Sequence, residues 1–153
     1  MIHRLLSTQV IPRPLDEVWE FFSTPKNLNA LTPPEMSFQF THGVDEPMYL
    51  GQLIEYRVQI LPLIKATWLT EITHLKDHSY FVDEQRIGPY QFWYHEHRFT
   101  EIQAGTLTTD TVTYSIPLGS LGGDIIHSLL IRPKLQTIFS YRQLKLNELF
   151  SHD

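Results

Sequence analysis

The longest helical pattern in the chain is GDIIHSLLIRPKLQTIFSYRQLKLNELF, residues 123–150. Apolar residues recur in it at spacings of three, four and seven, which places them on one broad face of a helix. These residues are Ile131, Leu135, Ile138, Phe139, Leu146, Leu149 and Phe150. Because an apolar face of this width needs a partner, we expect the helix to lie against the rest of the domain.

Pro133 interrupts this helical pattern. A proline disfavours helical dihedrals in the residue before it, here Arg132, but is well tolerated in the first turn of a helix. The apolar residues upstream of the proline are out of phase with those downstream; they are Ile125, Ile126, Leu129 and Leu130. We therefore expect a short helical segment, a break near Arg132, and then the main helix from about Pro133 to Phe150.

Upstream of Pro117 the apolar residues mostly follow a period of two, which is typical of half-buried strands. Strands are predicted at residues 2–11, 36–40, 53–60, 64–73, 80–87, 91–102 and 106–116. Two short helices, from Pro14 to Phe22 and from Asn27 to Leu31, are predicted after the first strand. This order indicates an α+β fold, in which a curved antiparallel sheet of about seven strands wraps around the long C-terminal helix and leaves a hollow.

Composition narrows the possible classes of protein. The 153 residues suit one domain spanning 1–153. A formal net charge of -5 argues against a nucleic-acid partner. The chain has no cysteine, and no apolar run approaches the length of a transmembrane segment. We therefore expect a cytoplasmic protein without a membrane span; the oligomeric state is left open.

Four motifs resemble those of the helix-grip superfamily known as SRPBCC, which includes START lipid-transfer domains, the birch pollen allergen group and polyketide aromatase/cyclases. They are PLDEVWEFF at residues 14–22, NL at 27–28 followed by LTPP at 31–34, GPY at 88–90 with WYHEHRF at 93–99, and DTVTYSIP at 110–117. The resemblance covers essentially the whole chain and is nearest to the small bacterial ligand-binding members. It implies the helix-grip fold and a cavity for a hydrophobic ligand between the sheet and the C-terminal helix.

Alternation along the predicted strands indicates which side chains share the inner face. Trp93, His95, His97 and Phe99 alternate with polar residues, so this set is predicted to point inward. Antiparallel register then brings Asp83 near His95, Phe81 near His97, and Asp110 near His97. The predicted ligand-binding residues are Tyr56, Trp68, Phe81, Asp83, Gln85, Trp93, His95, His97, Phe99, Asp110, Tyr114, Leu135 and Ile138.

Polar residues on this otherwise apolar face leave three interpretations open. The aspartates and histidines could only satisfy one another inside the sheet. They could hydrogen-bond the polar end of an apolar ligand. They could also, together with Tyr114, move protons in an enzyme of the cyclase or dehydratase type. We expect the binding function, with the enzyme as the alternative and a protein-interaction module without ligand as the third possibility; no catalytic residue is assigned.

The same residues include types that bind metal ions. His95 and His97, with Asp83 and Asp110 nearby, provide the ligand types that zinc takes, and same-face residues of a strand lie close enough for two imidazoles to converge. The motif, however, supplies no third histidine. The sequence therefore predicts no metal and no cofactor.

Overall fold

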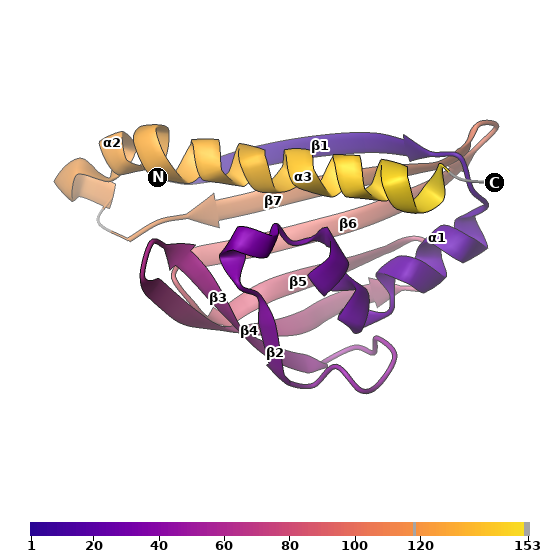
Figure 1. Cartoon of the computed structure of the whole chain (residues 1–153), viewed down its shortest axis with the longest axis horizontal. Helices are drawn as coiled ribbons and strands as arrows, with labels where there is room; N and C mark the ends of the chain where they lie inside the picture. Colours follow the sequence, from indigo (N-terminus) through magenta and orange to yellow (C-terminus); the bar gives the residue numbers. More distant parts are fainter. Residues whose placement is uncertain (118, 152–153) are drawn as a thin grey trace.

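The computed structural model describes residues 1–117 and 119–151. Seven strands form one sheet in the order β1-β7-β6-β5-β4-β3-β2, and every neighbouring pair is antiparallel (Figure 1). The strands are β1 (His3–Ile11), β2 (Gln39–His42), β3 (Leu53–Leu61), β4 (Ile64–Lys76), β5 (Tyr80–Ile87), β6 (Phe92–Ile102) and β7 (Gly105–Ser115). The predicted α+β class and antiparallel sheet are confirmed.

Short helices follow β1, as predicted. They are the α-helix α1 (Leu15–Phe22) and the 3-10 helices η1 (Pro25–Leu31) and η2 (Pro34–Met36). The prediction of a strand at 36–40 was wrong in its first part, because η2 occupies Met36 and β2 begins only at Gln39. Two prolines fix the backbone ahead of Met36, and Ser37 then takes a left-handed conformation (φ 48°), which is incompatible with a strand.

The C-terminal helical region is longer than predicted and runs through Arg132, but it is kinked upstream, where Leu121 and Gly122 have non-helical dihedrals. It comprises η3 (Gly119–Gly123), α2 (Asp124–Ile126), the π-helical turn η4 (His127–Ile131) and α3 (Arg132–Phe150). The predicted break near Arg132 was wrong, since this residue is helical with φ -59° and ψ -48°. A π-helical turn carries an extra residue, so the hydrogen-bond ladder is already interrupted where Pro133 lacks its N–H.

Helix α3 lies lengthwise along the sheet (Figure 1). Its buried residues are Leu135, Phe139, Arg142, Leu146 and Phe150, whereas Leu149, which was predicted on the same face, is 44% exposed. Leu146 and Phe150 join one apolar cluster with Trp19 and Phe99, and Leu135 and Phe139 join a second with Trp68 and Trp93. The long helix therefore holds two apolar clusters against the sheet, and Arg142 lies between the positions that contribute to them.

Among residues 1–117 and 119–151, no helix is both long enough and apolar enough to cross a membrane.

Candidate functional site

A cavity of about 400 Å³ lies between α3, the inner face of the sheet and the short helices. Its walls are mostly aromatic and aliphatic, with contributions from β2 to β6, from η1 and from α3. Leu61, Ile126 and Leu130 line the cavity and are also 38%, 36% and 52% exposed, so they mark a side of it that opens to solvent. We call these three residues the mouth.

Nine of the thirteen predicted ligand-binding residues line this cavity: Tyr56, Trp68, Phe81, Asp83, Trp93, His95, His97, Leu135 and Ile138. The other four, Gln85, Phe99, Asp110 and Tyr114, do not. The register prediction was correct, since Asp83 pairs with His95, Phe81 with His97, and His97 with Asp110. Knowing which face a residue occupies was therefore not enough to place it at the cavity.

Gln85 and Phe99 are occupied elsewhere. The β5–β6 ladder ends at Glu84, and the Gln85 side chain then accepts from the backbone N–H of Tyr90 (3.0 Å) and donates to its carbonyl oxygen (2.6 Å). Phe99 points to the same side as His97 but packs edge-on against Trp19 in the apolar cluster under α1. Gln85 therefore closes the loop between β5 and β6, and Phe99 fills the core.

Tyr114 faces the N-terminal part of the helical region rather than the cavity. Its hydroxyl lies 2.7 Å from Nε2 of His127, and the His127 ring stacks on that of His3 with centroids 3.5 Å apart. Tyr114 is buried, with 2% of the residue exposed, and its contact with His127 joins β7 to η4. This contact could not be predicted from strand alternation, because it depends on how η4 packs.

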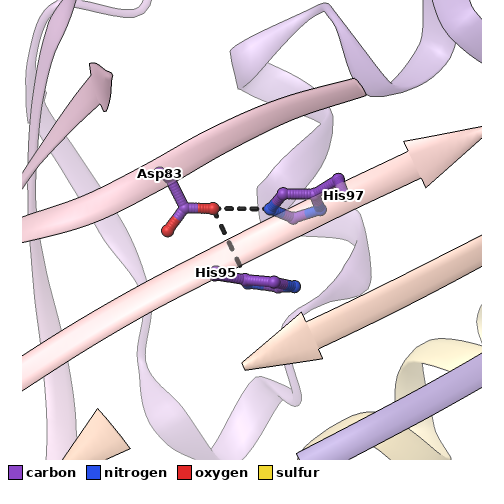
Figure 2. A group of neighbouring side chains, drawn as sticks. All are labelled: Asp83, His95 and His97. Atoms are coloured by element: carbon purple, nitrogen blue, oxygen red, sulfur yellow. Dashed lines mark hydrogen bonds and ion pairs between the residues drawn. The ribbon is translucent and has the colours of Figure 1, made fainter. Parts of the chain in front are cut away.

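Figure 2 shows Asp83, His95 and His97 converging on one another from β5 and β6. Asp83 Oδ2 lies 2.5 Å from His97 Nε2 and 3.6 Å from His95 Nδ1. The other nitrogens of the two rings both face Asp110 Oδ1, at 2.8 Å for His95 Nε2 and 3.1 Å for His97 Nδ1. We call these four residues, together with Arg142, the ionic cluster.

Arg142 completes the ionic cluster from α3. Its guanidinium NH2 group donates to Asp110 Oδ1 at 3.2 Å, and only 7% of the residue is exposed. Arg142 was not predicted from the sequence, although a signal was present. It follows Phe139 by three residues and precedes Leu146 by four, so a charged residue stood on the buried stripe of the helix and required a buried acidic partner.

The protonation states follow from burial and pairing. Burial alone would raise the pKa of Asp83 and Asp110, but the imidazoles and Arg142 outweigh it and hold both pKa values below their usual range, that of Asp110 well below. Burial lowers the pKa of His95, and the neighbouring His97 lowers it further. For His97, burial opposes the charge, yet bonds to Asp110 and Asp83 raise its pKa. His97 therefore holds an additional proton more readily than His95.

Two buried donors in the cavity wall have no hydrogen-bond partner among the described residues. They are Nε1 of Trp68 and Nε of Arg142. Both residues line the cavity and are 8% and 7% exposed. Because an unpaired buried N–H costs about 1–3 kcal/mol, a molecule in the cavity that carries acceptor oxygens would gain by pairing with them.

Several lining residues lie outside the regular strands and were not predicted. They include Leu28, Leu31, Met36, Phe38 and Tyr90. A lysine is also present: Lys134 of α3 donates to the carbonyl oxygen of Ile60, and burial lowers its pKa. Strand alternation carries no information about such loop and short-helix positions, because their orientation depends on how they close over the sheet.

Comparisons with known proteins fit this geometry. No family model matches the sequence, and no curated protein matches it either. Solved structures do match, over nearly their whole length. Protein CV1439 from Chromobacterium violaceum has a TM-score of 0.70 and 14% identity, with 98% of this chain and 99% of that chain covered.

Two further matches have descriptive names. The Zhui aromatase/cyclase from Streptomyces has a TM-score of 0.68 and 14% identity, with coverage of 97% and 96%. Major latex-like protein 151 from Panax ginseng has a TM-score of 0.66 and 11% identity, with 97% of each chain covered. At these identities the likeness concerns the fold alone. The chain thus has the helix-grip fold, and the predicted resemblance to the SRPBCC superfamily is confirmed at that level.

Proposed function

We propose that this protein binds a hydrophobic small molecule in the cavity between its sheet and α3. The observation that carries the proposal is the cavity itself, about 400 Å³ in volume and walled by aromatic and aliphatic side chains. Ligand pockets of soluble proteins have this size and make-up, with a few polar groups that fix orientation. A lipid, a polyketide or an aromatic compound would match such walls.

The polar groups of the wall favour a ligand that carries oxygen. Trp68 Nε1 and Arg142 Nε are donors in need of an acceptor. Asp83 adds an acceptor, because its Oδ1 atom accepts no hydrogen bond from the described residues. A mainly apolar molecule with a carbonyl or hydroxyl group at one end would therefore pair with groups that the protein leaves unpaired.

A cavity-filling variant tests this function. Ile138 lines the cavity, so Ile138→Trp would occupy part of the volume, whereas Leu144, which is 65% exposed on the same helix, offers the control Leu144→Trp. Affinity for apolar compounds is measured by their displacement of 1-anilinonaphthalene-8-sulfonate. We expect Ile138→Trp to bind them at least about ten-fold more weakly than the wild type, a loss of about 1.4 kcal/mol in binding free energy, and Leu144→Trp to bind as the wild type does. Equal affinity in all three proteins, each still folded, would contradict binding in this cavity.

An enzyme of the cyclase or dehydratase type is the second candidate. It is favoured by one observation: His95 Nε2 faces the carboxylate of Asp110, which leaves Nδ1 beside Asp83 at the cavity wall as a possible proton acceptor. Native mass spectrometry of protein purified without detergent separates the candidates. A co-purified compound that is released unchanged supports binding, whereas conversion of a supplied polyketide supports the enzyme.

A further inference from the structure

The orientation of the two imidazoles in the ionic cluster carries information beyond apolar binding. Because an ionised carboxylate only accepts hydrogen bonds, His95 Nε2, which lies 2.8 Å from Asp110 Oδ1, is placed as an N–H donor. His97 Nδ1 lies 3.1 Å from the same oxygen and 3.4 Å from the Arg142 guanidinium, and a protonated His97 donates to Asp110 through Nδ1 and to Asp83 through Nε2. The remaining nitrogens, His95 Nδ1 and His97 Nε2, both face Asp83 Oδ2 (Figure 2). The two imidazoles therefore lie between two carboxylates, with one nitrogen of each ring facing Asp110 and the other facing Asp83.

This is the arrangement that metal-binding histidines have in proteins. The ring nitrogen that is not bound to metal donates to a carboxylate or carbonyl, which fixes the tautomer and the ring orientation. Here Asp110 has that outer position for both rings and is itself held by Arg142 at 3.2 Å. The three inner atoms, from Asp83, His95 and His97, all lie within 4.8 Å of one another.

We propose that Asp83, His95 and His97 bind a divalent first-row transition metal ion, with Zn²⁺ as the best match, and that Asp110 and Arg142 form its outer shell. Two imidazole nitrogens and one carboxylate oxygen suit zinc or iron, and they disfavour magnesium and calcium, which take oxygen ligands. The expectation of no metal rested on the lack of a third histidine. The carboxylate of Asp83 fills that position.

The three ligand atoms, which lie within 4.8 Å of one another, must adjust their separations to hold a zinc ion. Tetrahedral ligand atoms at about 2.0–2.1 Å from zinc lie roughly 3.3 Å apart. His95 Nδ1 and Asp83 Oδ2, at 3.6 Å, are already close to this separation, while His97 Nε2 and Asp83 Oδ2, at 2.5 Å, must move apart by less than an ångström. Asp83 is the least enclosed of these side chains, at 19% exposure against 7% for each histidine, so its carboxylate has room to move.

Charge and position both favour a cation here. A metal ion that binds His97 displaces the proton that this histidine shares with Asp83. With both imidazoles then neutral, two carboxylates face one guanidinium, and the protein groups of the ionic cluster carry one negative charge. Asp83, His95 and His97 line the cavity, whereas Asp110 does not. Any coordination position that the protein does not fill thus opens into the cavity, where water or the oxygen of a bound molecule would complete the shell.

Calorimetric titration of the full-length, chelator-treated protein with Zn²⁺ tests the site. We expect one ion per chain and binding at least about ten-fold weaker in His97→Ala and in Asp83→Asn. Asp110→Asn retains the three ligands but loses the outer acceptor, and should bind about 10–100-fold more weakly than the wild type. His78 has Asp77 at 3.0 Å and Asp16 at 3.3 Å, so His78→Ala controls for a rival surface site and should bind as the wild type does.

Several results would overturn the proposal: no ion bound by the wild type, undiminished binding in folded His97→Ala and Asp83→Asn, or binding lost in His78→Ala. Should the cluster variants fail to fold, Co²⁺ added to the His78→Ala protein decides the matter. A four- or five-coordinate site of nitrogen and oxygen ligands gives intense visible absorption. The weak spectrum of six-coordinate Co²⁺ would exclude the inner shell proposed here.

Discussion

At the scale of single residues, Arg142 decides the electrostatics of the interior. Among the described residues, it supplies the one guanidinium of the ionic cluster. It comes from α3, whereas the two aspartates come from the sheet. Its charged group also lies 5.3 Å above the ring of Phe22 and 5.9 Å from that of Phe139, so apolar rings exclude water around it. Arg142 therefore ties α3 to β7 through a buried ion pair.

Removing this guanidinium should destabilise the whole domain. Arg142→Met keeps the length of the side chain but leaves Asp110 as a buried charge without its strongest opposite charge. We expect the free energy of unfolding, measured with urea, to fall by about 3–5 kcal/mol. The control Arg57→Met changes an exposed arginine on β3 and should cost no more than about 0.5 kcal/mol.

A double variant shows whether the loss comes from the unpaired charge. In Arg142→Met/Asp110→Asn the carboxylate is removed together with the guanidinium, so part of the stability should return relative to Arg142→Met alone. Strict additivity of the two single effects would mean that Arg142 and Asp110 do not interact as described. The buried position of Arg142 would then matter only for packing.

At the scale of elements, η4 is joined to the sheet by polar and aromatic contacts. His127 meets the Tyr114 hydroxyl of β7 at 2.7 Å and stacks on His3 of β1 at 3.5 Å. Burial lowers the pKa of His127, and the nearby His3 and Arg132 lower it further, against a smaller opposite effect of Asp124. The docking of η4 thus favours the neutral form of this imidazole.

This preference makes stability depend on pH. Below about pH 6.5, the ordinary pKa of histidine, the unfolded chain binds a proton at His127 that the folded chain resists. The contribution is therefore complete above that pH and is lost as the pH falls. In urea unfolding at pH 7.5 and 5.5, we expect the wild type to lose more stability than His127→Gln, whose amide can still meet Tyr114.

The control for this measurement is an exposed histidine on β4, replaced in His74→Gln. His127 is unchanged in this variant, so the part of the stability loss that His127 causes should remain. A loss in His127→Gln as large as in the wild type would show that η4 does not resist protonation of His127.

Elements whose side chains alternate regularly were predictable from the sequence. The sheet is one example: along β6, Trp93 to Phe99 gave the inner face and the pairing of Asp83 with His95. Elements shaped by backbone exceptions were not. The π-helical turn before Pro133 and the left-handed Ser37 both depend on local hydrogen bonding that a hydrophobic pattern does not encode.

At the scale of the whole molecule, the cavity is a property of how layers fit together. Alternation shows that Asp83 and Asp110 both face inward, yet only Asp83 reaches the cavity, because Arg142 of α3 covers the Asp110 side of the cluster. Residue spacing cannot give the distance between helix and sheet. For the same reason the sequence indicated a hollow without giving its volume or its mouth.

The position of the mouth leads to a prediction about motion. Residues 123–131 present exposed apolar side chains on one side, with Ile125 65% and Leu129 70% exposed, and line the cavity through Ile126 and Leu130. Segments with few buried contacts open locally at a lower free energy than the core. A molecule that enters the cavity at the mouth passes this segment, which contributes Ile126 and Leu130 to it.

Hydrogen exchange followed by mass spectrometry should therefore distinguish two parts of the C-terminal helical region. Without ligand, amides of residues 123–131 should exchange faster than those of 135–150, where Leu135, Phe139 and Leu146 are buried. Saturating 1-anilinonaphthalene-8-sulfonate should slow exchange in 123–131, because the bound dye contacts the inner side of this segment and stabilises its closed form. In Ile138→Trp the dye should give no such protection, since the indole fills its place. Uniform exchange along 123–150 without ligand would contradict local opening of residues 123–131. Equal protection by the dye in both proteins would show that the ligand does not rest against this segment.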